Sequence, residues 1–337
     1  KITQYAAQSE RGDFLDFCDD YFQARVVDKV VLLNKQVLLT IKASSIVEKH
    51  VDGQFVRLQS FESLSSVESG YSLYGEAVSV PIFAVDKINK TFKVLLLNRL
   101  VSEKLLANIA VGSLVSAMGP TGVRAKVLTD AATVLLLVDQ DLIAHACAII
   151  NALHSQGHFV IVLLQLNAVI DDHLRCYLEK YAGVIIWEAE FDVSSRPQDL
   201  LVGLGSAWPE LLNYLANNMS VASKLIDVRL MVDAAKVAEI KEKLADLTKV
   251  SGAALSYCSV AVYGPMQCML KGVCAQCLQW QIDPISGERT KAVYACSWQD
   301  QPLDLVDLSH LTLRHNPNKV LEKLNSLILC NLKLNSK

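Results

Sequence analysis

The chain has 337 residues, of which 52% are hydrophobic, and a formal net charge of −3. This length has room for two or three domains, each with its own core. Basic and acidic residues are interspersed and form no basic patch, so we expect no nucleic-acid partner. No apolar run approaches the ~20 residues that span a bilayer, so we expect no transmembrane segment.

The chain begins at Lys1, without an apolar signal region and without an initiator methionine. We therefore expect a fragment of a longer protein or a processed chain. Nine cysteines, an odd number, are spread unevenly along the sequence. This is not the pattern of a secreted disulfide framework, which favours a reducing, cytoplasmic location.

Residues 1–22 are predicted to form a helix, because Phe14, Phe17 and Tyr21 recur at helical spacing. Residues 23–126 are predicted to form a β-barrel domain. Short alternating or β-branched segments lie at 24–33, 37–43, 55–58, 78–85 and 92–97. Many short strands separated by turn-forming residues indicate a closed barrel.

Residues 127–255 have a different pattern, in which apolar runs alternate with amphipathic segments. Strands are predicted at 133–138, 159–164, 184–188 and 225–232. Helices are predicted at 142–154, 171–181, 209–217 and 234–247, and the charges at 236–249 are interpreted as a solvated helix face. The alternation predicts a doubly wound parallel sheet. The predicted fold class is therefore a β-barrel followed by an α/β domain.

Residues 256–337 are cysteine-rich and irregular in pattern, with a short amphipathic helix predicted at 319–329. Cys268, Cys274 and Cys277 lie in one loop, and Cys296 follows a turn sequence. Three thiols in a loop plus one distant thiol have the outline of a [2Fe–2S] ligand set. A structural zinc site and reduced cysteines in a core are the alternatives, although zinc usually prefers paired Cys-x-x-Cys knuckles.

The order of barrel, doubly wound domain and cysteine loop resembles the ferredoxin–NADP reductase superfamily, in particular the electron-transfer subunit of dihydroorotate dehydrogenase. Gly53-Gln54-Phe55-Val56 looks like that family's "GQF" strand, and Gly119-Pro120-Thr121-Gly122 looks like its "GPxG" element. The segments 57–62, 195–199, 265–277 and 296–304 are similar to the C-terminal module of large bacterial FAD-dependent oxidoreductases. In those enzymes the module follows a region that resembles the glutamate-synthase small subunit.

The resemblance implies an oxidoreductase component that works with a partner subunit or domain. It implies FAD in the barrel, exchanging electrons with a nicotinamide nucleotide, NAD(P), and with a [2Fe–2S] cluster. The implied cofactor-binding residues are Ser79, Gly119, Pro120, Thr121 and Gly122. The implied cluster ligands are Cys268, Cys274, Cys277 and Cys296.

Several loops depart from the family. The strand 77–80 keeps Ser79 but lacks the family's arginine, and the phosphate loop 98–103 has no glycine and contains Glu103. The turn after the first α/β strand contains Asp139 and Asp141 in place of glycines, and the turn 231–234 has also lost its glycine. We therefore expect degenerate nicotinamide and flavin sites in a relay subunit. The alternatives are a non-redox scaffold with structural zinc and an intact FAD-dependent NAD(P)H reductase.

Two smaller predictions concern polar side chains outside these motifs. His310 and His315 follow the cysteine segment, and we expect both at the surface. Arg196 has two open interpretations, an anion-binding residue or a brace within its loop.

Overall fold

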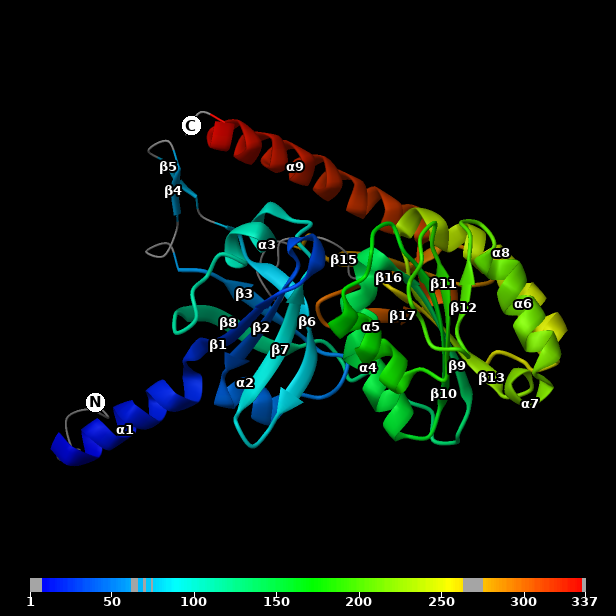
Figure 1. Ribbon diagram of the computed structural model, residues 1–337, viewed down its shortest axis with the longest axis horizontal. Coiled ribbons are helices and arrows are strands. Elements are labelled where there is room, and N and C mark those ends of the chain that lie inside the picture. Colours follow the sequence, from blue (N-terminus) through cyan, green and yellow to red (C-terminus); the bar gives the residue numbers. More distant parts are fainter. Residues whose placement is uncertain (1–7, 62–65, 69–70, 74, 263–274, 335–337) are drawn as a thin grey trace. The chain divides into compact units, whose positions relative to one another are not determined.

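The computed structural model describes residues 8–61, 66–68, 71–73, 75–262 and 275–334 (Figure 1). The chain divides into two compact units. The barrel unit comprises residues 1–121 and 325–337, and the sheet unit comprises residues 122–324. None of the described helices has the length and apolar character needed to cross a membrane.

The barrel unit contains helix α1 (Gln8–Phe22) and a closed barrel, which confirms the predicted barrel. In order of hydrogen bonding the strands are β1 (Ala24–Val31), β2 (Val37–Lys42), β7 (Thr91–Leu96), β6 (Val78–Asp86), β3 (Phe55–Gln59) and β8 (Leu114–Thr121). Apolar side chains from these strands, such as Val26, Leu39 and Phe92, are fully buried inside. Two short helices, α2 (Ser44–Lys49) and α3 (Val101–Leu106), and a hairpin of β4 (Ser66–Glu68) and β5 (Tyr71–Leu73) lie between the strands along the chain. The sequence pattern did not predict these short elements.

The sheet unit is built on a sheet of seven strands, which confirms the predicted doubly wound α/β fold. In spatial order the strands are β12 (Leu200–Val202), β11 (Val184–Glu188), β10 (Phe159–Gln165), β9 (Thr133–Asp139), β13 (Leu225–Met231), β14 (Tyr257–Ala261) and β17 (Asp300–Pro302). Only β17 runs antiparallel to its neighbour. Every residue of β9 is buried, which explains its continuously apolar sequence.

Helices connect the parallel strands. They are α4 (Ile143–Ser155), α5 (Asp172–Tyr181), α6 (Ala207–Asn217), α7 (Met219–Ala222) and α8 (Ala234–Ser251). The chain proceeds from β9 to β10 on one side and returns to β13 on the other. In open α/β sheets the carboxyl edge at such a reversal is the usual place for a ligand.

The region after residue 256 is more regular than predicted. It supplies the sheet strands β14 and β17 and a separate hairpin of β15 (Leu278–Ile282) and β16 (Arg289–Tyr294). Helix α9 (Leu308–Leu334) also begins eleven residues before the predicted start at 319. Asp307 explains the earlier start, because its carboxylate accepts a hydrogen bond from His310 N at 2.9 Å.

Candidate functional site

Two of the predicted cluster ligands are adjacent in the structure. Cys277 precedes β15 and Cys296 follows β16, and the Sγ atoms lie 3.5 Å apart. Both side chains are buried, at 6% and 2% exposure. The separation is far longer than the ~2.05 Å of a disulfide. Two thiolates about 2.3 Å from one tetrahedral metal would be about 3.8 Å apart, so the pair has nearly the spacing of two ligands on one metal ion.

The hairpin register brings these cysteines together. Leu278 pairs with Tyr294, and Ala295 N donates a hydrogen bond to Cys277 O at 2.8 Å. Arg289 on β16 then ties the hairpin to the start of α9 through an ion pair with Asp307 at 2.8 Å. The pair is therefore held by backbone pairing and by a side-chain clamp.

Cys268 and Cys274 lie outside the described residues. Among the residues that are described, no group of three or more histidine, cysteine, aspartate or glutamate side chains could hold a metal ion. The donor set of the described part is thus a buried pair of thiols. Such a pair suits either iron or zinc, because both metals accept thiolate ligands.

Ser79, one of the predicted flavin-binding residues, has a buried hydroxyl in the barrel. Ser79 lies on β6 opposite Arg57 of β3, and its buried Oγ has no hydrogen-bond partner in the described structure. A buried hydroxyl without a partner loses the hydrogen bonds it would make in water. Ser79 therefore fits a polar ring edge that would complete its hydrogen bonding.

The segment of Gly119, Pro120, Thr121 and Gly122 ends β8. Gly119 and Gly122 have φ values of 151° and 92°, which favour glycine. A Cβ on Gly119 would also meet Phe55 O at 3.3 Å. These glycines are explained by backbone geometry, so they do not by themselves point to a cofactor.

In the predicted flavin-phosphate loop, two backbone N–H groups already donate hydrogen bonds to Glu103. Glu103 is 5% exposed, and its Oε2 accepts hydrogen bonds from Arg99 N at 2.9 Å and Leu100 N at 3.3 Å. These are the backbone donors at the start of α3. A pyrophosphate at this position would have to displace a buried carboxylate and would be repelled by it. The loop therefore does not fit a pyrophosphate.

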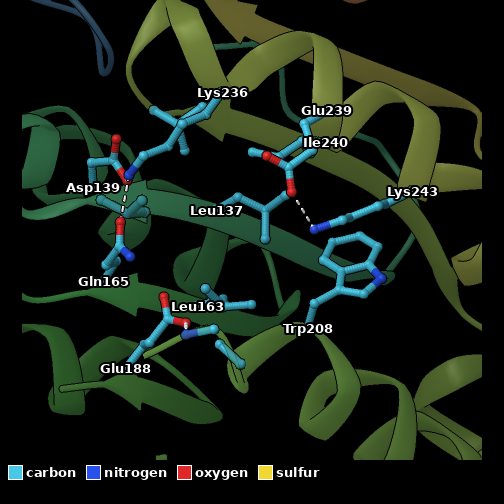
Figure 2. A pocket seen from close by; sticks show the side chains of 14 residues that line it. Leu137, Asp139, Leu163, Gln165, Glu188, Trp208, Lys236, Glu239, Ile240 and Lys243 are labelled. Atoms are coloured by element: carbon cyan, nitrogen blue, oxygen red, sulfur yellow. Dashed lines mark hydrogen bonds and ion pairs between the residues drawn. The ribbon is translucent and has the colours of Figure 1, made fainter. Parts of the chain in front are cut away.

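The carboxyl edge of the sheet has a similar arrangement (Figure 2). Asp139, at the end of β9, accepts a hydrogen bond from Asp233 N at 2.8 Å and pairs with Lys236 Nζ at 2.7 Å. Lys236 also donates to Gln165 Oε1 of the neighbouring strand β10. Lys319 of α9 adds an ion pair with Asp233 at 2.6 Å. The position of a nicotinamide-nucleotide phosphate is thus taken by a network of the chain's own side chains.

Other strand-end amides have internal acceptors as well. Gln140 Oε1 accepts from Asn167 N at 2.7 Å and from Ala168 N at 2.9 Å. Glu188 Oε1, at the end of β11, accepts from Gly205 N at 2.6 Å. Phosphate binding at such an edge depends on available backbone N–H groups. The side chains present do not fit a dinucleotide here.

A small pocket remains beside this network. It encloses about 250 Å³, has an apolar floor that includes Leu137 and Leu163, and is walled by Trp208 of α6 (Figure 2). An ion pair between Lys243 and Glu239, 2.5 Å apart, lies at its edge. The volume is below the roughly 300–1,000 Å³ of ordinary ligand sites. The pocket is therefore too small to accept a whole dinucleotide.

Sequence reasoning missed Lys236, which was interpreted as part of a solvated helix face. A lysine in the first turn of α8 is opposed by the helix dipole, and this unfavourable position was the available signal.

Two predictions about single side chains can also be compared with the structure. His315 was expected at the surface but is only 6% exposed. Arg196 proves to be a brace: it forms an ion pair with buried Asp199 at 2.8 Å and donates to Ala182 O at 3.1 Å.

The search of solved structures identifies the fold. The structure of an NADH-dependent reduced ferredoxin-NADP oxidoreductase, described as an insight into flavin-based electron bifurcation, matches with a TM-score of 0.65 and 15% identity. The match covers 90% of this chain and 97% of that chain. The chain has the ferredoxin–NADP reductase-like fold. This agrees with the resemblance in the sequence motifs.

Two further solved structures match with lower TM-scores. The flavohem-like FAD/NAD-binding domain of nitric oxide dioxygenase from Vibrio cholerae matches with 17% identity and a TM-score of 0.48, over 73% of this chain and all of that domain. The ferredoxin-NADP+ reductase of Plasmodium falciparum matches with 10% identity and a TM-score of 0.48, over 72% of this chain and 96% of that chain.

One curated protein matches in sequence. Uncharacterized protein RP006 of Rickettsia prowazekii is 35% identical over 88 residues. The match covers 26% of this chain and only 12% of that protein's length. No family model matches the chain. The relationship with solved structures therefore establishes the fold, while the activity has to be argued from the site.

Proposed function

We propose that this chain is an electron-transfer module of a larger oxidoreductase, with a [2Fe–2S] cluster held by Cys268, Cys274, Cys277 and Cys296. When bound, such a cluster accepts and releases one electron at a time. The observation that carries the proposal is the buried Cys277–Cys296 pair, with its sulfur atoms 3.5 Å apart. Four thiolates can hold two irons, two on each, so this pair would share one iron.

The proposed role as an electron relay is supported by the chain's own side chains at the two positions where this fold would bind cofactor phosphates. Glu103 occupies the donors at the start of α3, and Asp139 with Lys236 occupies the sheet edge. Hydride exchange with NAD(P)H would then belong to a partner subunit or domain. The buried hydroxyl of Ser79 still suits the ring of a flavin, although the adjacent loop does not suit the pyrophosphate of FAD.

The decisive experiment is metal and cofactor analysis of the anaerobically purified chain. We expect two irons and two acid-labile sulfides per chain, a visible spectrum typical of an iron–sulfur protein, and no NAD(P)H-dependent reduction. Cys296→Ser should remove the iron. Cys176→Ser is the matched control, because Cys176 is exposed on α5 and should keep it.

Two other outcomes would identify different functions. Stoichiometric zinc without colour would contradict the relay and support a non-redox scaffold, since the same thiol pair suits zinc. Stoichiometric FAD that NAD(P)H reduces would mean that the chain is an intact reductase. Either result would overturn the proposed function.

A further inference from the structure

Helices α1 and α9 each expose a row of apolar side chains. On α1 the exposed fractions lie between 51% and 63%, for Phe14, Leu15, Phe17 and Phe22. On α9 they lie between 44% and 61%, for Val320, Leu321, Leu324, Leu327 and Ile328. Exposed apolar patches of this density on a folded chain usually mark an interaction surface.

The row on α9 is separate from the face that the helix buries within its own chain. Val320, Leu324 and Leu327 are spaced by four and three residues, so they follow one side of the helix. Leu311 and Leu329, at 1% and 8% exposure, are instead buried. The helix therefore presents a second apolar side that the described residues of its own chain leave exposed.

Helix α1 is attached to its chain by its C-terminal end. Asp20 pairs with Lys42 at 2.8 Å, and Ser44 Oγ donates to Asp20 O at 3.2 Å. Phe14 and Phe17, one turn earlier and three residues apart, share a side of the helix and are each 56% exposed. The C-terminal end of α1 is thus joined to β2 and α2, while the aromatic row remains exposed.

The charges of the two helices are complementary. Helix α1 carries four aspartates, Asp13, Asp16, Asp19 and Asp20, and its first turn adds Glu10 and Arg11, so its acids outnumber its bases five to one. Before its apolar row ends, helix α9 carries three basic residues, Arg314, Lys319 and Lys323, and one acid, Glu322. Lys319 already pairs with Asp233 and Arg314 donates to Val262 O, so the exposed Lys323 is the main charge offered to a partner. Pairing α1 with α1 would bring carboxylates together, and pairing α9 with α9 would bring ammonium groups together. Only the mixed pairing joins apolar rows and opposite charges.

We propose that α1 of one copy of this chain packs against the exposed row of α9 in a second copy. This inference is independent of the metal site and of electron transfer. In a two-fold dimer the contact would form twice, so both rows of both copies would be covered. The stem of Lys323 beside the α9 row would cover the edge of the aromatic side chains while its ammonium group faces the aspartates of α1.

Sedimentation of the full chain over a concentration series tests the pairing. We expect a dimer, and we expect Leu327→Glu or Phe17→Glu to raise its dissociation constant by roughly tenfold or more, as for a central apolar contact. Ile88→Glu is the control, because Ile88 is 92% exposed in the turn between β6 and β7 and should leave the dimer unchanged. A monomer at all concentrations, or a dimer that is insensitive to both helix variants, would overturn the proposal.

Charge reversal separates the mixed pairing from like-with-like pairing. Lys323→Glu and Asp16→Lys should each weaken the dimer, and combining them in one chain should restore part of the loss. If Lys323→Glu strengthens the dimer, α9 pairs with itself and the proposal is wrong. Raising the salt concentration should weaken the wild-type dimer, because the aspartates and lysines are exposed.

Native cysteines allow a direct readout. Cys18 lies on α1 and exposed Cys330 lies on α9. In a mixture of isotope-labelled and unlabelled chains, a bis-maleimide should join Cys18 of one copy to Cys330 of the other. Exposed Cys176 on α5 should give no such product with Cys18. A Cys18–Cys330 product found only within single chains would contradict the intermolecular contact.

Discussion

Lys236 Nζ lies 2.7 Å from Asp139 Oδ1, so a lysine from α8 neutralises a carboxylate at the carboxyl end of the central strand β9 (Figure 2). The other oxygen of Asp139 accepts the N–H of Asp233, the residue that caps α8. One aspartate thus joins the strand, the helix and the lysine. This arrangement replaces the anion site that the fold usually offers at this edge.

Asp139→Ala should lower the free energy of unfolding by about 1–3 kcal/mol, because Asp233 N would lose its acceptor in a partly buried position. Lys236 is itself 41% exposed, so its lost ion pair should add little. Urea denaturation measures the change. Asp130→Ala, at an exposed position, is the control and should be neutral; equal stability of the two variants would contradict the structural role of Asp139.

The chain should not bind NADH or NADPH at its own sheet edge. Gln140, Glu188 and Asp139 accept the strand-end amide hydrogen bonds that a phosphate would require. Calorimetric titration of the metal-loaded chain with either nucleotide should show no saturable heat. Saturable binding that appears only in Asp139→Ala would agree with a blocked site, whereas saturable binding to the unaltered chain would refute the blockage.

Glu103→Ala should destabilise the barrel unit by about 1–2 kcal/mol, because the carboxylate caps two backbone donors at the start of α3. Glu103→Gln should cost less, since an amide oxygen can accept one of the hydrogen bonds. Thermal unfolding followed by circular dichroism measures both variants. Lys104→Ala tests the position, because it changes the adjacent residue of the same helix without removing the cap.

Deprotonation of Asp300 should lower the free energy of unfolding as the pH rises. Burial raises its pKa from 3.8 to about 6, although the Arg229 charge opposes the shift. Between these values the folded chain holds a proton that the unfolded chain has released, so stability falls with rising pH across this window. Asp300→Asn should therefore be more stable than the wild type at pH 8 by up to about 3 kcal/mol, with the difference disappearing below pH ~4. Urea titrations at a series of pH values give this comparison, and a constant difference would refute it.

Protonation of His315 should lower the free energy of unfolding as the pH falls. Burial, followed by the charge of Arg314, lowers its pKa from 6.5 to about 4. The unfolded chain therefore binds a proton that the folded chain excludes, and stability is lost as the pH falls through this window. His315→Asn should flatten the pH profile between pH ~6.5 and ~4, by about 1–3 kcal/mol. Asn316→Ala is the control, because Asn316 is the exposed neighbour of His315 on α9 and has no titratable group.

Most of the fold could be predicted from periodicity. The strand 133–138 is apolar at almost every position because β9 is buried on both faces, and the barrel strands have short alternating patterns. The strand β14 was missed because its sequence, Tyr-Cys-Ser-Val-Ala, is short and half polar. Its place beside β13 depends on backbone pairing with residues some thirty positions earlier, from Asp227 onward, which a local pattern does not contain.

For the candidate site, the sequence predicted which residues take part and how they are spaced along the chain. The cysteine spacing placed Cys277 and Cys296 in one proposed cluster, and the structure brings their sulfur atoms to 3.5 Å. The acids Glu103 and Asp139 were recognised in the sequence as unfavourable for phosphate, and this stays a prediction. The hydrogen bonds that give these acids a positive role, such as the one from Asp233 N, could not be read from the sequence.

The sequence by itself determined the barrel, the parallel sheet and the identity of the candidate thiol ligands, because hydrophobic period and cysteine spacing are local properties. Only the tertiary structure decided how the sheet edge is occupied. The ion pair of Asp139 and Lys236 joins residues 97 positions apart, and the link from Asp139 to Asp233 spans 94. Contacts across such distances exist only once the strands have paired and α8 has packed, because unfolded residues so far apart in the chain rarely meet.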